Sequence, residues 1–221
     1  MTAWSGRLTL CAVLFTALSI SGCASWSWWP GTENVAAQRV TGVLEHANGN
    51  WTLQACGTQQ ALPLQPDSRL PELFKQVAQP GQLAIFGELE AEPREGRWVV
   101  QNTRRLLSTG RGCLDESAAD SQWVGLSFNP QWRVDITGQG MQLTAPDSEN
   151  GQKMSVISEL LPDGSRNFRD AGERSLELWL YPNDCFERSS GDYYYLSATL
   201  IRDGQRLAGC GYQGGVDHTP R

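Results

Sequence analysis

Apolar and polar residues alternate over short stretches in the first half of the chain, a pattern typical of half-buried strands. Val40, Val43 and Leu44 lead into Asn48-Gly49, a dipeptide that favours a tight hairpin turn. A turn-rich segment at 92–96 separates two longer runs. The strands expected from this pattern lie at about 40–44, 51–55, 60–64, 82–90 and 97–107.

One stretch in this half has the spacing of a helix. Asp67 or Ser68 can cap its start, Pro71 lies in its first turn, and Pro80-Gly81 ends it. Its apolar residues form one stripe, made of Leu70, Leu73, Phe74 and Val77. Three strands, a helix and two strands are the element order of an OB-type five-stranded barrel, which we expect over residues 38–115.

The small, acidic segment 116–121 predicts a linker, and a second antiparallel β domain is expected over 122–213. Trp132, Val134 and Ile136 alternate there with polar residues, which predicts one buried and one solvated face. Frequent turns between short strands favour an antiparallel barrel or sandwich.

Two other parts of this domain have clear patterns. Strands at 193–201 and 205–211 flank Asp203-Gly204, the tip of a hairpin. The polar stretch 160–172 is expected to be a long loop. The fold class predicted for the whole chain is therefore mainly β.

The N-terminal 22 residues have the layout of a removable export signal. Arg7 precedes an apolar run from Leu8 to Ile20, which is shorter than the roughly 20 residues that span a bilayer. Small residues then stand directly before Cys23, as lipoprotein processing requires. We expect Cys23 to carry N-acyl and diacylglyceryl chains, the alternative being an ordinary secretory signal with a chance cysteine. Ala24 favours an outer-membrane location facing the periplasm, by similarity to Gram-negative lipoproteins.

Residues 23–37 are expected to be a tether, and 214–221 a flexible tail. Trp26, Trp28 and Trp29 in the tether suit either the membrane interface or packing against the folded domain. Both alternatives stay open at this stage.

The charge of the chain excludes one class of partner. Lys and Arg number 18 against 24 Asp and Glu, a net charge of −6, and no basic stripe is present. Nucleic-acid binding needs Lys and Arg to displace counterions, so we expect no nucleic-acid partner. The composition leaves the oligomeric state open.

Four cysteines remain once Cys11 leaves with the signal and Cys23 is acylated. An oxidising periplasm favours two disulfides, for which three connectivities are possible. Pairing within each half would close loops of roughly 57 and 25 residues. No C-x-x-C pair or histidine at ligand spacing accompanies these thiols, so we expect no metal site and no cofactor. The four are Cys56, Cys113, Cys185 and Cys210.

The stretch from Val40 to about Asp115 resembles the C-terminal OB domain of the NlpE family of outer-membrane lipoproteins. The resemblance rests on the segments 40–43, 50–57, 68–70, 83–90 and 112–113. It implies a disulfide between Cys56 and Cys113 and a role in reporting surface contact or lipoprotein-trafficking faults to an envelope-stress kinase. The separate N-terminal domain of that family, with its C-x-x-C segment, is missing here, so its association with copper is not carried over.

The second half resembles a poorly characterised β domain of bacterial envelope lipoproteins. The matching segments are 128–132, 183–185, 193–194 and 204–210. In that domain a Glu stands in the first motif and Ser-Asp follows the first cysteine, whereas here Cys185 precedes Phe186-Glu187-Arg188. The resemblance implies a fold and a second disulfide, but no reaction.

No catalytic group stands out. The two histidines, His46 and His218, lie beside a turn and in the tail, where nothing would hold an imidazole rigidly. Carboxylate pairs such as Asp184 with Glu187 are explained by solvated loops. We therefore expect a protein that is not an enzyme.

Aromatic residues crowd the last third of the chain, and exposed Tyr, Trp and Arg are favoured at binding sites. The candidate binding surface is made of Trp179, Tyr181, Arg188, Tyr193, Tyr194 and Tyr195. The expected function is non-catalytic binding or sensing of envelope state, possible partners being the membrane and an envelope protein. The alternative is a wall-associated protein that binds a glycan, or inhibits a lytic enzyme, through this aromatic surface.

Overall fold

The computed structural model describes residues 36–146, 153–172 and 176–215. The predicted export signal, Cys23, His218 and nearly all of the predicted tether and tail lie outside these residues. Residues 35–221 form one compact unit. No helix among the described residues is long and apolar enough to cross a membrane.

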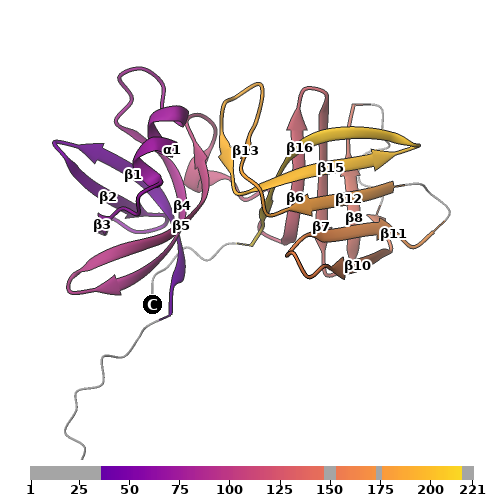
Figure 1. Cartoon of the computed structure of the whole chain (residues 1–221), viewed down its shortest axis with the longest axis horizontal. Coiled ribbons are helices and arrows are strands. Elements are labelled where there is room, and N and C mark those ends of the chain that lie inside the picture. The colour runs from indigo at the N-terminus through magenta and orange to yellow at the C-terminus, as the bar shows by residue number, and fades with distance from the viewer. Residues whose placement is uncertain (1–35, 147–152, 173–175, 216–221) are drawn as a thin grey trace, which may run out of the picture. The chain divides into compact units, whose positions relative to one another are not determined.

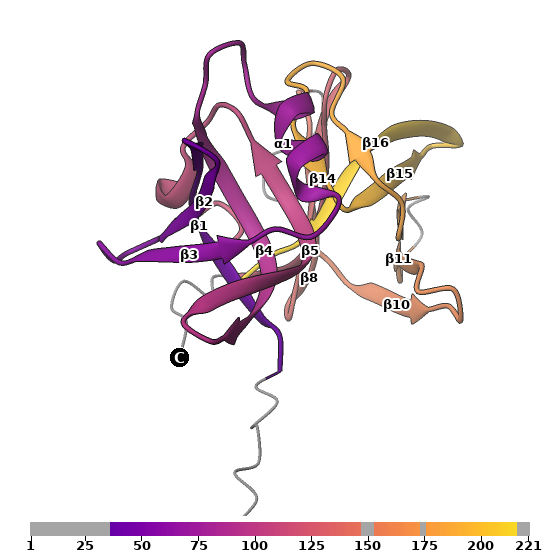
Figure 2. The same ribbon diagram turned by 60° about the vertical axis from the view of Figure 1, so that its left-hand side comes forward.

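The first half forms the predicted barrel, with the helix between its third and fourth strands (Figures 1 and 2). β1 pairs with both β2 and β4, and β4 pairs with β5. A short parallel contact of β3 with β5, at Leu64 and Gln65, closes the cylinder. The OB-type prediction is confirmed at the level of this barrel and its element order. The elements are β1 (Gln38–Ala47), β2 (Asn50–Ala55), β3 (Ala61–Gln65), α1 (Leu70–Val77), β4 (Ala84–Arg94) and β5 (Arg97–Leu107).

The helix of this barrel starts slightly later than its sequence predicts. Its N-cap residue is Arg69, which makes no side-chain cap hydrogen bond, and not Asp67 or Ser68. Asp67 Oδ1 still accepts from the backbone N–H of Leu70 at 2.9 Å and so satisfies one free donor of the helix start. All four residues of the apolar stripe are buried in the barrel core. The Phe74 ring meets Trp51 edge-on at 5.2 Å, which attaches the helix to β2.

The second half forms one nine-stranded antiparallel sheet in which most strands pair with their chain neighbours and the last strand, β16, pairs with the first, β6. The two end strands of this order, β9 and β10, are separated in sequence by Ser155 alone, whose carbonyl accepts from the N–H of Ala171. One nearly continuous strand thus pairs with β8 at its start and with β11 along its length, so the sheet curls into a barrel (Figure 1). The strands are β6 (Ser121–Phe128), β7 (Gln131–Thr137), β8 (Gly140–Thr144), β9 (Lys153–Met154), β10 (Val156–Leu160), β11 (Arg166–Asp170), β12 (Leu176–Tyr181), β15 (Leu196–Arg202) and β16 (Gln205–Gln213).

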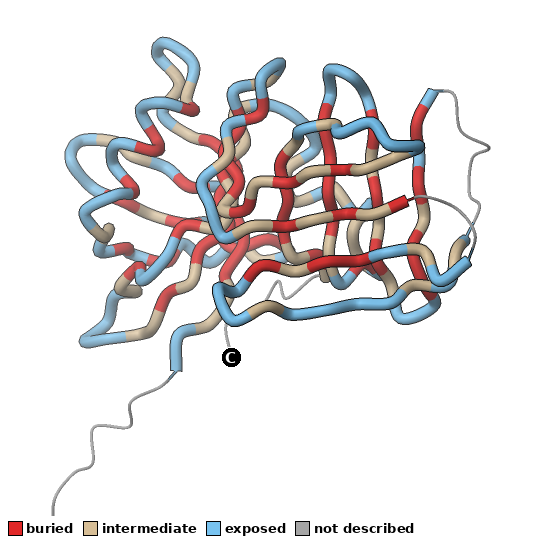
Figure 3. The backbone as a smooth tube through the Cα atoms, turned by 45° about the vertical axis from the view of Figure 1, so that its right-hand side comes forward, coloured by how far each residue is buried: buried red, intermediate tan, exposed pale blue. Residues whose placement is uncertain are grey.

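Buried and less buried positions alternate along most of these strands (Figure 3). The buried side chains form the core of the barrel. Glycines allow the opposite walls to approach. A Cβ at Gly125 of β6 would lie 2.6 Å from Leu178 Cδ1, and one at Gly211 of β16 would lie 2.6 Å from Leu180 Cδ2. The leucines of β12 therefore occupy space that side chains on β6 and β16 would otherwise fill.

Two local predictions for this half are wrong. The expected loop 160–172 contains β11, a polar strand in which Phe168 reaches the barrel core. The expected strand 193–201 is divided at Tyr195 into β14 (Tyr193–Tyr194) and β15. In both places cross-strand pairing outweighs the local pattern.

The divided strand joins the two sheets. β13 (Cys185–Phe186) pairs with β14, and β14 pairs with β5, so both extend the sheet of the first barrel. The Cys185–Cys210 disulfide then connects β13 to β16 of the second barrel. The other disulfide joins Cys56 to Cys113 in η1 (Gly112–Leu114), so both pairings that lie within one half of the chain are confirmed.

The predicted linker is held in place. Arg133 donates to the carbonyl of Ser117 at 3.1 Å and forms an ion pair with Asp135 at 2.8 Å. The N–H of Gly215 donates to the carbonyl of Ala118 at 2.9 Å. The segment between the barrels is thus bonded both to β7 and to the residues that follow β16.

Candidate functional site

A cavity of about 480 Å³ opens at one end of the second barrel. The β6–β7 turn, the end of β8 and the β15–β16 hairpin form its edges. Barrel mouths are a preferred place for ligand sites, and this volume lies in the usual range for them. We call this cavity the mouth pocket. Its described lining residues are Pro130, Gln131, Trp132, Ala145, Pro146, Leu200, Arg202, Asp203, Gln205 and Leu207.

The alternation of the strands gives the mouth pocket an apolar wall and a polar rim. Trp132 on β7 and Leu200 on β15 point into the barrel and are 2% and 0% exposed. Leu207 packs against the same core. Gln131 and Gln205 lie at strand ends and are exposed. The pocket therefore has apolar groups below amide groups that can both donate and accept hydrogen bonds.

Two details define the polarity of the mouth pocket. Arg202 Nε lies 3.7 Å from Asp203 Oδ2, and these two side chains of opposite charge are the charged ones among the described lining residues of the pocket. The indole Nε1 of Trp132 is buried and has no hydrogen-bond partner among the described residues. Buried polar groups normally have partners, but this nitrogen has almost no accessible surface, so the mouth pocket does not expose it to a ligand.

The predicted aromatic surface is not one surface. Tyr193 and Tyr194 are only 1% and 3% exposed, which removes both from it. The Tyr193 hydroxyl donates to Asp184 Oδ1 at 2.8 Å, and the Tyr194 ring packs against Tyr212. Burial raises the pKa of both tyrosine hydroxyls. These side chains are buried because β14 joins the sheet of the first barrel.

The other members of the predicted surface are separated from one another. Trp179 and Tyr181 lie on the outer face of β12, half-buried, with nearly parallel rings whose centroids are 6.0 Å apart. Tyr195 packs against both barrel cores and lies beneath the guanidinium of Arg104, at 4.8 Å. Arg188 is exposed in the turn after β13. Trp179, Tyr181 and Arg188 keep some accessible surface.

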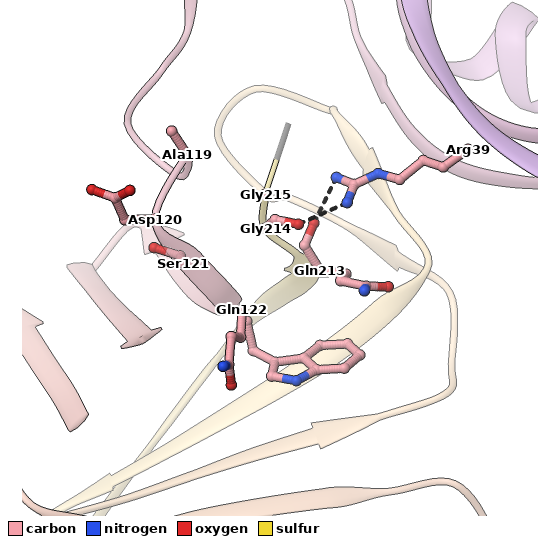
Figure 4. Close-up of a pocket in the computed structure, with 9 residues that line it drawn as sticks. Arg39, Ala119, Asp120, Ser121, Gln122, Gln213, Gly214 and Gly215 are labelled. Carbon is pink, nitrogen blue, oxygen red and sulfur yellow. Dashed lines mark hydrogen bonds between the residues drawn. The ribbon is translucent and has the colours of Figure 1, made fainter. Parts of the chain in front are cut away.

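A second concavity, of about 550 Å³, lies beside Arg39 and the end of β16 (Figure 4). The guanidinium of Arg39 donates to the carbonyls of Gly214, at 2.7 Å, and Gln213, at 2.8 Å. Its Nε also pairs with Glu88 at 2.8 Å. Two nitrogens of Arg39 hold β1 against the end of β16 and the third pairs with Glu88 of β4, so we assign this concavity a structural role.

Two buried carboxylates fix the segment that joins the barrels. Glu187 was expected in a solvated loop but is only 3% exposed, and Asp192 was not singled out from the sequence. Glu187 accepts from the backbone N–H groups of Phe128 (3.1 Å), Ser189 (2.7 Å) and Ser190 (2.9 Å). Burial acts to raise the pKa of Glu187, but these hydrogen bonds outweigh burial and hold the pKa below its ordinary value. Asp192 accepts from the N–H of Ser108 at 2.9 Å, and burial raises its pKa.

Among the described residues, no three His, Cys, Asp or Glu side chains lie close enough to hold a metal ion. Two sequence features that were singled out, the segment 128–132 and the Asp203-Gly204 turn, contribute residues to the edge of the mouth pocket.

Comparisons with protein-family models, curated proteins and solved structures found no match for this chain.

Proposed function

We propose that this chain is a lipid-anchored protein of the bacterial envelope that acts by binding a ligand in the mouth pocket of its second barrel. The observation that carries the proposal is the cavity at a barrel mouth, where the buried side chains of Trp132 and Leu200 lie below exposed amide side chains. The mouth pocket is a better candidate than the predicted aromatic surface, two of whose members are buried. It is also better than the concavity at Arg39, whose guanidinium is fully engaged.

The anchoring part of the proposal rests on the sequence. The apolar run that ends in Gly22-Cys23 supports acylation, and Ala24 supports the outer membrane. The tether would hold the unit that begins at Val35 close to the membrane surface. The resemblance of residues 40–115 to the NlpE-type domain supports a role in sensing, in which a bound ligand or a protein partner would change the signal sent onward.

The test uses the whole mature chain with Cys23→Ser, which makes it soluble. We would measure its melting temperature with and without an envelope extract, beside a Gln205→Trp variant whose indole fills the pocket entrance. The expected result is stabilisation by the extract that the variant loses, because a ligand that binds only the folded state stabilises it.

Ala208→Trp is the matched control. Ala208 lies on the same strand as Gln205 but is exposed and does not line the pocket. Equal stabilisation of all three proteins would reject the mouth pocket as the site. In-cell crosslinking of the lipidated chain, followed by pull-down, tests a protein partner separately.

A further inference from the structure

We infer that β10 pairs edge to edge with β10 of a second copy of this chain, so that the second barrels of both copies share one continuous sheet. Three features of the strand carry the inference: an edge of unpaired backbone groups, exposed apolar side chains, and a sequence that is complementary to itself. The inference goes beyond ligand binding and does not depend on the mouth pocket.

The backbone of β10, at the margin of the second barrel, is hydrogen-bonded on one side (Figure 2). Just beyond one end of the strand, the N–H of Leu161 donates to the carbonyl of Ser165 at 2.9 Å. At the other end, the N–H of Ala171 donates to the carbonyl of Ser155 at 2.9 Å. Because residues of an antiparallel strand direct their backbone groups alternately toward and away from the partner strand, every second residue of β10 directs its N–H and C=O away from β11.

These outward-directed residues form what we call the free edge. They are Val156, Ser158 and Leu160. β8 pairs with β9 only, at Met141 and Gln142, and does not extend along β10. Among the described residues, nothing bonds to the backbone groups of the free edge. The second barrel therefore ends here in a row of donors and acceptors that another strand can pair with.

The free edge lacks the features that usually prevent strand pairing. Exposed edges are commonly protected by Lys, Pro or a bulge, whereas β10 contains no Lys or Pro and pairs with β11 in unbroken register. Its one charged residue is Glu159, whose Oε1 lies 3.7 Å from Arg169 Nη2 on β11. Ile157 and Leu160 are 41% and 63% exposed. Apolar side chains and a neutralised charge favour the approach of a second strand.

The sequence of β10 matches itself when two copies run antiparallel about Ser158. Val156 of each copy then lies opposite Leu160 of the other, and every backbone group of the free edge has a partner. Ile157 lies opposite Glu159, so no two like charges face each other directly. Val156 already packs against the barrel core, so pairing with it covers the exposed leucine. A second copy thus satisfies the edge in both its backbone and its side chains.

The experiment introduces one thiol into the mature Cys23→Ser chain, in which the four remaining cysteines form two disulfides. In the inferred register Ser158 lies opposite its own counterpart with Cα atoms about 5.5 Å apart, a spacing that a disulfide can bridge. Ser158→Cys should therefore give a covalent dimer on oxidation with diamide. Ser155→Cys is the matched control, because Ser155 is also exposed but would lie about 20 Å from its counterpart.

A second variant tests the backbone bonds. Ser158→Pro removes an N–H that points away from β11, so the pairing of β10 with β11 is kept while the free edge loses a donor. Sedimentation at increasing concentration measures the dimer, which should be weak because the interface is small. We expect Ser158→Pro to weaken the dimer roughly tenfold, since one hydrogen bond is lost from each copy, and Ser158→Ala to leave it within about twofold.

Equal crosslinking of the Ser158→Cys and Ser155→Cys variants, or a parent chain that stays monomeric at every concentration, would overturn the inference. Crosslinking of Ser158→Cys in cells to a different protein, in place of a product with twice the mass of the chain, would also overturn it. That result would show that the free edge takes an extended segment of another partner. An unchanged melting temperature shows that Ser158→Pro is folded, and the two cysteine variants decide the matter if it is not.

Discussion

Glu88 and Arg39 form an ion pair in which the carboxylate is 0% exposed and lies 2.8 Å from the guanidinium Nε. Arg105 also pairs with Glu88, with its Nη2 lying 3.2 Å from Glu88 Oε2. The Arg105 guanidinium lies 4.2 Å from the ring centre of Tyr212 on β16. Since Arg39 also bonds the carbonyls at the end of β16, this buried carboxylate helps to hold the first barrel against the second.

Replacing Glu88 by Ala should therefore be strongly destabilising. The change removes the carboxylate nearest to Arg39 and Arg105, whose side chains are only 15% and 12% exposed, and breaking a buried pair in this way costs about 3–5 kcal/mol. Urea unfolding of the Cys23→Ser chain measures the change. Glu45→Ala, at an exposed position of the same first barrel, should cost less than about 1 kcal/mol. A loss at Glu88 no larger than at Glu45 would show that the pair contributes little.

Removing the Cys185–Cys210 disulfide should destabilise the segment that connects the barrels, while the hydrogen-exchange protection of the two barrel cores stays unchanged. The bond closes a segment of 25 residues, for which the chain-entropy estimate is about 3 kcal/mol. In Cys185→Ser with Cys210→Ser we expect faster hydrogen exchange first in β13 and β14. Loss of protection spread evenly over both barrels would contradict this expectation.

The barrel order was predictable from the sequence because alternation and turn residues are local signals. Asn48-Gly49 and Asp203-Gly204 both lie at hairpin tips, and the stripe of Leu70, Leu73 and Phe74 forms the helix face that packs in the core. The intervals between cysteines also suited the two disulfides that form. The turn and helix signals depend on residues close in the chain.

Other features depend on partners far away in sequence. β11 is a strand because β10 and β12 pair with it, although Arg166, Asn167 and Arg169 make its own pattern polar. Tyr193 and Tyr194 are buried because β5 pairs with β14, which alternation alone does not indicate. The mouth pocket likewise forms where three separate turns meet, so a single pass along the chain shows only parts of its edge.

Glu187 and Asp192 should give opposite dependences of stability on pH. The folded pKa of Glu187 is lowered, so its contribution is present above its unfolded pKa and is lost as the pH falls through the folded value. Glu187→Gln should cost about 1–3 kcal/mol at pH 7, because hydrogen bonds to a charged group are lost. This difference should shrink in acid below the unfolded pKa.

The folded pKa of Asp192 is raised, so its ionised form is disfavoured by folding at neutral pH and that penalty vanishes below its unfolded pKa. Asp192→Asn keeps an oxygen for the Ser108 N–H, and it should match or exceed the parent in stability at pH 7. Urea unfolding at pH 7 and at pH 3 checks both variants. A loss for Asp192→Asn at pH 7 would show that its charge is stabilising.

Gly125→Ala should destabilise the second barrel by about 1–3 kcal/mol. The new methyl group would lie 2.6 Å from Leu178 Cδ1 and 3.3 Å from the Trp132 ring, and overpacking a core forces side chains away from their preferred rotamers. Gly138→Ala is the control, because nothing lies within 4 Å of a Cβ there. Denaturant midpoints of the two variants give the comparison, and equal midpoints would show that β12 can move to make room.

Cys23→Ser should release the chain from the membrane fraction of a Gram-negative host. Stable anchoring takes more than one acyl chain, and the proposed modification at Cys23 supplies an N-acyl group and a diacylglyceryl group together. Cys11→Ser is the matched control, since Cys11 lies inside the signal and would leave with it. Mass spectrometry of the parent should find the lipid on Cys23 at the new N-terminus. Retention of the serine variant in the membrane would mean that another part of the chain holds it there.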